Sequence, residues 1–214
     1  MSQGTLLILS GPSGAGKSTV IHRILERHPD FFFSVSATTR QPRGSERDGV
    51  DYHFITPAQF EDMIAGQSLL EYNHYASGDY YGTPGEPVRQ VLARGGTVLL
   101  DVEPNGAFQV REKLPEAVMI FLAPPSMAEL RRRLESRGDT SPDKIEKRLK
   151  QAHWELAQAP SYSYLLVNDQ VDGCVARLEA ILQGGPEADA SRYENQREVE
   201  ILKEVLSHAV SPHV

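Results

Sequence analysis

The chain has 214 residues, of which 40% are hydrophobic and 24% charged, and its formal net charge is −7 at pH 7. This length suffices for one α/β domain with modest insertions or for two small domains. The acidic balance argues against a general nucleic-acid binder, which needs a positively charged surface. A single cysteine, Cys174, excludes an internal disulfide and suits the reducing cytoplasm.

The amino-terminal segment has no basic region, and its short apolar run over residues 6–9 leads directly into a glycine-rich loop. We therefore expect residues 5–10 to form a strand rather than a signal peptide or membrane anchor. The longest later apolar run, residues 117–123, is far too short to span a bilayer. These features predict a cytoplasmic protein with no membrane or nucleic-acid partner.

Residues 11–18 match the pattern G-x-x-x-x-G-K-[ST], between an apolar strand and a predicted helix over residues 17–28. Glycines in this pattern let backbone N–H groups converge on phosphate oxygens at the positive end of the helix. Lys17 then reaches the β- and γ-phosphates, and the Ser18 hydroxyl ligates Mg²⁺. The predicted triphosphate-binding residues are Gly11, Pro12, Ser13, Gly14, Ala15, Gly16, Lys17, Ser18 and Thr19.

Strand and helix patterns alternate along the rest of the chain, which predicts an α/β fold. Thr56 is the expected N-cap of a helix with Pro57 at its first position. The strand over 97–102 carries Asp101, a carboxylate placed to orient Mg²⁺ or its waters. We expect strands over 34–39, 52–55, 69–72, 97–102, 118–122 and 164–168, and helices over 56–66, 87–94, 126–137, 141–159, 172–183 and 195–210.

Arginines are concentrated in two places, as a net acidic protein for anionic ligands requires. Arg40 and Arg43 stand three residues apart near a strand end and can present two planar donor forks to one phosphate dianion. Arg133 and Arg137 share one helix face, and Arg148 lies on the next helix. Such a helical hairpin can close over a triphosphate and bring cations to the transferring group.

The run S-A-T-T-R-Q-P-R at residues 36–43 is followed by Glu46, Gly49, Tyr52 and Phe54. This arrangement resembles the signature of the guanylate kinase family, of the bacterial type. The resemblance continues in the family's order over residues 4–183. Its further motifs are L-E at 70–71, G-D-Y-Y-G-T at 78–83, A-P-P-S at 123–126, R-L at 133–134, R-G at 137–138, K-R-L at 147–149 and V-N-D at 167–169.

The resemblance implies a P-loop NTPase three-layer fold with a parallel sheet flanked by helices, a small inserted α+β subdomain that binds the monophosphate, and a helical lid. The implied boundaries are a core of residues 4–33, 84–125 and 160–183, a GMP-binding subdomain of 34–83, a lid of 126–159, and a polar linker with a helical tail over 184–214.

The implied reaction is ATP + GMP ⇌ ADP + GDP, a Mg²⁺-dependent in-line phosphoryl transfer in purine nucleotide metabolism. The attacking phosphate oxygen is already ionised near neutral pH, so no general base is nominated. The family pattern assigns catalysis to Lys17, Arg133, Arg137 and Arg148, ATP binding also to Asn168, metal binding to Ser18 and Asp101, and GMP binding to Ser36, Arg40, Arg43, Glu46, Tyr52, Glu71, Tyr81, Thr83 and Glu103.

Within that set, Glu71 and Glu103 are expected to accept the guanine N1–H and N2 amine, with Ser36 and Thr83 facing O6. Adenine would leave the carboxylates unmatched, which is a strong form of discrimination. Three departures from the family pattern stand out. They are Pro104 and Asn105 after the acidic strand, one extra residue between Glu71 and Gly78, and the tail after Gly184.

Two alternatives remain open. Another kinase of the fold, for a ribosyl bisphosphate or a related nucleotide, should lack the paired arginines together with Glu71. A peptide-binding module of the scaffold-protein type should lack an intact Lys17 and Ser18. No N-K-x-D element of a GTPase occurs. The sequence leaves the oligomeric state open, a homo-oligomer included.

Overall fold

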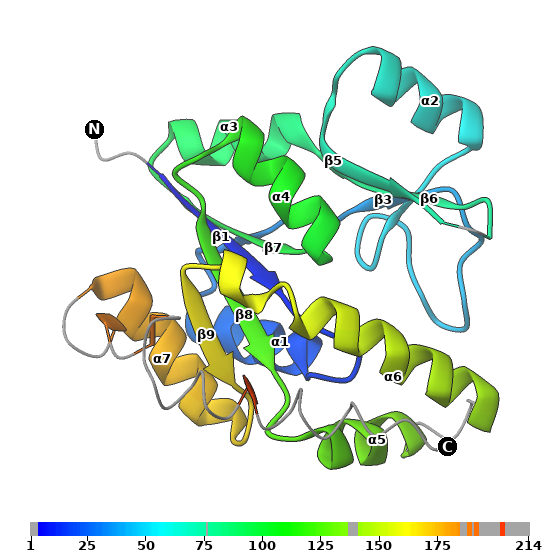
Figure 1. Ribbon diagram of the computed structural model, residues 1–214. Coiled ribbons are helices and arrows are strands. Elements are labelled where there is room, and N and C mark those ends of the chain that lie inside the picture. Colours follow the sequence, from blue (N-terminus) through cyan, green and yellow to red (C-terminus); the bar gives the residue numbers. More distant parts are fainter. Residues whose placement is uncertain are drawn as a thin grey trace. The chain divides into compact units, whose positions relative to one another are not determined.

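The computed structural model describes residues 4–75, 77–136, 141–184, 188–189, 191–192 and 202–203 (Figure 1). Contacts between residues divide the chain into two units. One unit runs up to Ile8 and from Pro29 to Val118, and the other runs from Leu9 to His28 and from Met119 onward. Strand β1 (Thr5–Ser10) contributes residues to both units.

The first unit contains a four-stranded sheet of order β4-β3-β6-β5, in which β3 is parallel to β4 and β6 is antiparallel to both β3 and β5. Its elements are β2 (Phe32–Phe33), β3 (Ala37–Thr38), β4 (His53–Phe54), α2 (Pro57–Ala65), β5 (Leu69–His74), β6 (Tyr80–Pro84), α3 (Gly85–Ala93), β7 (Thr97–Asp101) and α4 (Pro104–Lys113).

The second unit places helices α1 and α7 against each other and helices α5 and α6 against each other. Its elements are α1 (Lys17–Arg27), β8 (Val118–Ala123), α5 (Met127–Glu135), α6 (Pro142–Leu156), the 3₁₀ turn η1 (Ala159–Ser161), β9 (Tyr164–Val167) and α7 (Val171–Gln183).

A five-stranded parallel sheet has the order β2-β7-β1-β8-β9. In one outer pair Phe32 and Phe33 face Val98 and Leu99, and in the other Ile120 faces Tyr164. Strands β1, β7 and β8 are almost fully buried, as expected for parallel strands covered on both faces. The predicted α/β class and parallel sheet are therefore confirmed.

The single strand predicted over residues 34–39 was wrong. The structure has β2 just before it, in the five-stranded sheet, and β3 within it, in the four-stranded sheet. The Ser34 N–H still donates to the Leu99 carbonyl at 3.1 Å, while the Ser36 carbonyl accepts from the His53 N–H at 2.8 Å. Small and β-branched residues continue across the point where the chain changes sheets, so the pattern did not show the break.

Strand β6 and helix α4 were not anticipated. Helix α4 starts with Glu103 as its N-cap residue and Pro104 at its first position, where proline lacks only an N–H that no helix bond uses. Its Gln109 side chain accepts from the Tyr72 N–H at 3.1 Å and donates to the Tyr72 carbonyl at 3.0 Å. Helix α4 is thereby fastened to the outer strand β5 of the four-stranded sheet.

The predicted cap of helix α2 is confirmed. Thr56 Oγ1 accepts from the Gln59 N–H at 3.2 Å, and Gln59 Oε1 accepts from the Thr56 N–H at 2.9 Å, which makes a complete capping box. The helix then presents Phe60, fully buried, to one face of the four-stranded sheet. The Phe60 ring stacks on Tyr80 with centroids 5.1 Å apart, and His74 stacks on Tyr80 at 4.1 Å.

After Gly184, the described residues of the tail add to the edge of the five-stranded sheet. The Ser191 carbonyl accepts from the Leu165 N–H at 3.0 Å, and Arg192 pairs antiparallel with Tyr164. The helix predicted over 195–210 lies outside the described residues except for 202–203. Within the described part of the chain, every helix is too short or too polar to cross a membrane.

Phe60→Ala tests the packing of α2 on the four-stranded sheet. Removing a fully buried ring should lower the free energy of unfolding by about 3–5 kcal/mol, through lost apolar burial and the cavity left behind. Urea denaturation measures this value, with the exposed neighbour Glu61→Ala as the control expected to change it by less than about 0.5 kcal/mol. Equal effects of the two variants would contradict this packing.

Candidate active site

The loop between β1 and α1 has the conformation that a phosphate-binding loop requires. Gly11, Gly14 and Gly16 have φ of 147°, 94° and 95°, a region that other residues rarely adopt. A Cβ on Gly11 would lie 2.1 Å from the Leu122 carbonyl oxygen, so the backbone runs directly against β8. Helix α1 begins at Lys17 without a side-chain cap, which leaves the N–H groups of its first turn for an anion.

The Lys17 ammonium bends back across this loop and donates to the Gly11 carbonyl at 2.6 Å. Ser18 and Thr19 follow in the first turn of α1 with exposed side chains. The sequence thus predicted the local arrangement of residues 11–19 from the spacing of the motif alone.

Asn168 and Arg133 fix the loop from two other elements of the same unit. Asn168 is 3% exposed, and its amide donates to the Ala15 carbonyl at 2.7 Å. The Arg133 guanidinium donates to the Ala15 carbonyl at 3.2 Å and to the Asn168 carbonyl at 2.9 Å. A Cβ on Gly16 would lie 2.3 Å from Asn168 Nδ2, so only glycine fits there.

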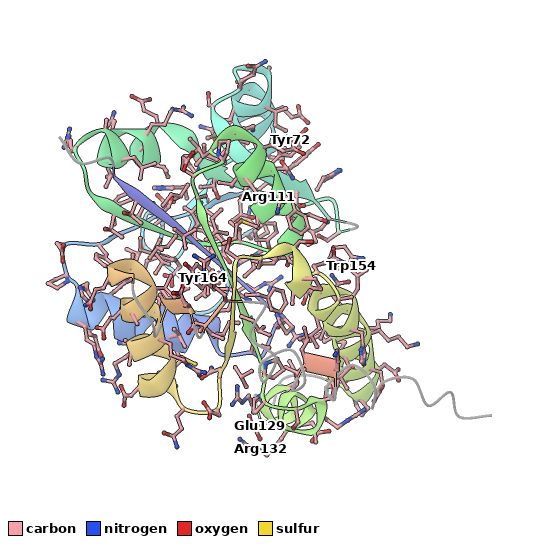
Figure 2. All side chains as sticks on the ribbon, turned by 60° about the vertical axis from the view of Figure 1, so that its left-hand side comes forward. Tyr72, Arg111, Glu129, Arg132, Trp154 and Tyr164 are labelled. Carbon is pink, nitrogen blue, oxygen red and sulfur yellow. The ribbon has the colours of Figure 1, made fainter. Side chains whose placement is uncertain are left out.

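Arg133 also donates from Nε to Glu129 at 2.8 Å, within helix α5. Arg132 binds the same carboxylate, and Figure 2 shows Glu129 and Arg132 side by side. Hydrogen bonds from Arg132 and Arg133 lower the pKa of Glu129 to about 2. Arg133 is therefore held against the phosphate loop before any ligand arrives.

The other two arginines predicted for the lid are Arg148 and Arg137. Arg148 lies half-buried on α6 and makes no hydrogen bond or ion pair with the described residues. Arg137 lies outside the described residues.

In the first unit, Arg40 is the centre of a buried cationic cluster. Its side chain donates to both oxygens of Glu46 at 2.7 and 2.8 Å and to the Tyr81 hydroxyl at 2.8 Å. Its guanidinium lies 5.0 Å from the ring centroid of Tyr52. The Glu46 hydrogen bond raises the pKa of Arg40, and the Arg40 and Arg43 hydrogen bonds lower the pKa of Glu46 to about 2.

This geometry refines the prediction that the guanidinium groups of Arg40 and Arg43 face one phosphate. The Nη edge of the Arg40 guanidinium is already occupied by the Glu46 carboxylate. The Arg43 backbone N–H donates to the same carboxylate at 2.8 Å, and the Arg43 side chain is exposed. Glu46, expected among the substrate contacts, therefore binds both arginines in this structure.

Glu71 is a buried carboxylate, 4% exposed, on strand β5. Thr83 donates its hydroxyl to Glu71 Oε1 at 2.6 Å, and the Asn73 amide donates to Oε2 at 3.4 Å. A Cβ on Gly106 would lie 2.5 Å from Oε2, so this glycine lets the carboxylate reach the first turn of α4. Burial raises the pKa of Glu71 to about 7, and the charge of Glu103 adds to the effect while Thr83 opposes it.

Thr83, expected to face the base oxygen, thus donates to Glu71 here, and the Ser36 carbonyl accepts from His53 on β4. Glu103 stands exposed at the N-cap of α4, close enough for its charge to act on Glu71. The structure therefore brings the two predicted base-binding carboxylates together.

Three residues of this region were missed by sequence reasoning, namely Asn73, Tyr75 and Gly106. Burial, together with the nearby charges of Glu103 and Glu71, holds the pKa of Tyr75 well above its usual value. Its ring meets Tyr81 edge-on with centroids 5.2 Å apart. The only sequence signal at Tyr75 was the extra residue between Glu71 and Gly78.

The two predicted metal ligands are hard oxygen donors, the Ser18 hydroxyl in the second unit and the Asp101 carboxylate at the end of β7 in the first. Mg²⁺ is commonly held by one or two such oxygens together with phosphates and waters, so each residue has the chemistry that the ion prefers. The described residues contain no group of three or more His, Cys, Asp and Glu side chains arranged for a metal.

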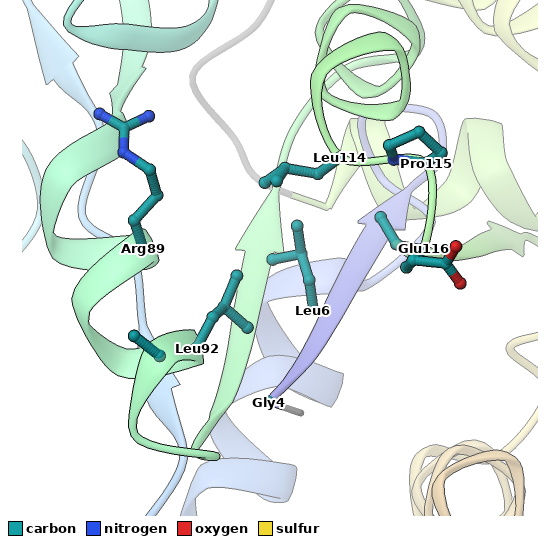
Figure 3. A pocket seen from close by; sticks show the side chains of 9 residues that line it. Gly4, Leu6, Arg89, Leu92, Leu114, Pro115 and Glu116 are labelled. Carbon is teal, nitrogen blue, oxygen red and sulfur yellow. The ribbon is translucent and has the colours of Figure 1, made fainter. Parts of the chain in front are cut away.

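A separate apolar pocket of about 400 Å³ lies in the first unit, near the amino end of β1 (Figure 3). Leu6, Leu92 and Leu114 form its apolar wall, with Arg89 and Glu116 also lining it. It shares no residue with the predicted nucleotide sites.

The parallel sheet and the phosphate loop before α1 define the class of protein, a P-loop NTPase fold. The sequence model of the guanylate kinase family matches residues 3–184. The chain belongs to the guanylate kinase family and is an enzyme, a kinase that transfers phosphate between nucleotides.

Individual relatives agree with this assignment. A guanylate kinase from Thermus thermophilus is 49% identical over 180 residues, which cover 84% of this chain and 81% of the relative. One from a Synechococcus strain is 46% identical over 181 residues, covering 85% and 83%. The crystal structure of guanylate kinase from Anaplasma phagocytophilum superposes with a TM-score of 0.70 at 30% identity, covering 94% of this chain and 95% of that one.

The raised pKa of Glu71 predicts a pH dependence of stability. The unfolded chain releases this proton near pH 4.5 and the folded chain near pH 7, so the folded state binds more protons in between. The free energy of unfolding should therefore fall as the pH rises through this window, by about 3 kcal/mol from this group. Below pH 4.5 this carboxyl is protonated in both the folded and the unfolded chain, so it adds no pH dependence to the free energy of unfolding.

Urea denaturation of the wild type and of Glu71→Gln at pH 5 and pH 8 measures this effect. The variant cannot ionise, so it should gain stability relative to the wild type at pH 8. The exposed Glu61→Gln is the matched control, expected to show no such change. If the difference in the free energy of unfolding between Glu71→Gln and wild type stayed the same at both pH values, burial would not penalise the charge of the Glu71 carboxylate.

Proposed function

We propose that this enzyme catalyses ATP + GMP ⇌ ADP + GDP by direct, Mg²⁺-dependent in-line phosphoryl transfer. The observation that carries the base assignment is Glu71, a buried carboxylate with Glu103 beside it, on the unit that also holds the Arg40 cluster. Guanine offers two adjacent donors, N1–H and the N2 amine, and two carboxylates can accept both. Adenine has no N1–H and no N2 amine, so it would leave buried acceptors unmatched.

The acceptor phosphate is assigned to Arg40 and Arg43, with the hydroxyls of Tyr52 and Tyr81. Arg40 and Tyr81 are already joined at 2.8 Å, and Arg40 is held in place by Glu46. We assign Glu46 a supporting role, because its two oxygens orient the guanidinium instead of contacting the substrate. Thr83 has a similar role toward Glu71, and Ser36 remains assigned to the base.

The donor ATP is assigned to residues 11–19 and Asn168. Backbone N–H groups of the loop bind the phosphates, and the Lys17 ammonium exchanges its bond to the Gly11 carbonyl for phosphate oxygens. Arg133 keeps the loop in shape through Ala15 and Asn168 and contributes positive charge there. Arg148 and Arg137 are assigned to the phosphoryl group in transfer.

Bound Mg²⁺, held by Ser18 with Asp101 orienting its waters, would neutralise charge on the phosphates. The acceptor oxygen is ionised at neutral pH, so the chain supplies no general base. Its residues act by holding two anions in line and by offsetting the charge on the moving group. We also assign residues 34–83 to GMP binding, residues 126–159 to a lid, and the protein to the cytoplasm.

The function is tested by a coupled assay that measures ADP release with ATP, Mg²⁺ and each of four nucleoside monophosphates. Turnover with GMP should exceed that with AMP, CMP or UMP by at least about 100-fold in kcat/KM, because only guanine satisfies the carboxylate pair. Removing Mg²⁺ with a chelator should abolish turnover. Equal turnover with AMP would refute the base assignment.

Lys17→Ala and Glu71→Gln separate the two substrate sites. Lys17→Ala should lower kcat by at least about 100-fold while leaving the Kd for GMP nearly unchanged. Glu71→Gln should raise the KM for GMP about tenfold or more and spare the KM for ATP, because it replaces an acceptor of the base. If Lys17→Ala instead destroyed GMP binding, the two sites would be misassigned.

A further inference from the structure

Strand β5 contains a β-bulge directly before the buried carboxylate of Glu71. In the pairing of β5 with β6, Leu69 lies opposite Pro84 and Glu71 lies opposite Thr83. Two steps along β5 therefore match a single step along β6, and Leu70 is the extra residue. Such a bulge bends the strand and changes the face toward which the following side chains point.

The side chains on either side of the bulge show this change of face. Before it, Leu69 is buried in one apolar cluster with Phe60 of α2. After it, Tyr72 meets the same Phe60 ring with centroids 6.5 Å apart. Residues three apart in a regular strand point to opposite faces. Without the bulge, Glu71 would share the face of Leu69 and lie among the apolar residues around Phe60.

Helix α4 fixes the backbone of β5 on both sides of the bulge. Strand β5 is the outer strand of the four-stranded sheet, so one row of its backbone groups faces away from β6. The Gln109 carboxamide accepts from the Tyr72 N–H at 3.1 Å and donates to the Tyr72 carbonyl at 3.0 Å. The Lys113 ammonium donates to the Leu69 carbonyl at 3.0 Å. The bulged segment is thereby held at both of its ends.

These contacts come from one side of the helix. Gly106, Gln109 and Lys113 follow one another at spacings of three and four residues, which places them on the same side of α4. Gly106 lies against Glu71, where a Cβ would come within 2.5 Å of Oε2. The side of the helix that leaves room for the carboxylate therefore also fixes the strand that carries it.

We propose that Gln109 is a positioning residue for guanine recognition, which holds the bulge at Leu70 so that the Glu71 carboxylate points toward the base. This inference rests on the proposed function, because that function assigns Glu71 to the guanine donors. A hydrogen bond weakens steeply as its angle departs from linearity, so a small turn of the strand weakens the contact with the base. The Gln109 amide is neutral and acts through the position of the strand, and Lys113 supports the same bulge from its other end.

Gln109→Met tests the proposal, since methionine keeps the length of the side chain and removes both hydrogen bonds to Tyr72. The Kd for GMP, measured by calorimetry, should rise about tenfold, because the acceptor of the base is no longer aligned. The inhibition constant of ribose 5-phosphate, which has the phosphate but no base, should stay within about twofold of wild type. Gln90→Met is the matched control and should change neither value, since the exposed Gln90 amide bonds only within α3, to Glu86.

A second variant keeps the test decisive if Gln109→Met folds poorly. Gln109→Asn retains a polar amide on the helix surface but withdraws it by one methylene from Tyr72. It should weaken GMP binding in the same direction, again without affecting ribose 5-phosphate. Urea denaturation of both variants measures their stability. A loss of stability with unchanged GMP binding would make Gln109 a purely structural residue and overturn the proposal.

A double-mutant cycle with Glu71→Ala shows whether Gln109 acts through this carboxylate. If it does, Gln109→Met should weaken GMP binding by less than about twofold in the Glu71→Ala background. An undiminished effect in that background would mean that Gln109 supports the unit as a whole. Equal weakening of GMP and ribose 5-phosphate in the single variant would mean the same. Either result overturns the proposal.

The failure of this proposal is distinguishable from failure of the proposed function. A wild-type enzyme that prefers GMP, with a Gln109→Met variant that binds it equally well, rejects only the role of Gln109. A wild type that turns over AMP as fast as GMP rejects both.

Discussion

Burying the carboxylate of Glu71 is the constraint around which the first unit is organised. A charge removed from water is costly unless donors and opposite charges surround it. The hydrogen bonds that compensate it come from Thr83 on β6 and Asn73 on β5 itself, and Gly106 leaves room for the carboxylate against the first turn of α4. The positive charge of Lys113, at the end of α4, favours the ionised form as well. The hairpin and the helix must therefore form together before this carboxylate has its surroundings.

The compensation is incomplete, and this has a functional meaning. Because the pKa of Glu71 lies near 7, its charge is only partly satisfied by the protein. A ligand that brings two N–H donors supplies what is missing, so ionisation and binding support each other. In the proposed function, selectivity for the base and the stability of the first unit both follow from the desolvation of this one carboxylate.

In both units a cationic residue is matched by a carboxylate of the protein. Arg40 is held by Glu46 in the first unit, and Arg133 is held by Glu129 in the second. In both cases the acid orients the guanidinium, so the side chain loses little further conformational freedom when a substrate binds. This local pairing explains how a chain with a net charge of −7 can bind two anionic nucleotides without a broadly basic surface.

The sequence by itself determined the features whose physics is local. Glycines and Lys17 at fixed spacing specify the phosphate loop, and Thr56 with Gln59 specifies a helix start, because both depend on backbone geometry within a few residues. Tertiary structure decided what depends on contacts between distant segments. These features include the change of sheet between β2 and β3, the approach of α4 to Glu71, and the edge-on packing of Tyr75 against Tyr81. No local pattern encodes such contacts, since hairpin register and helix docking arise from packing across the chain.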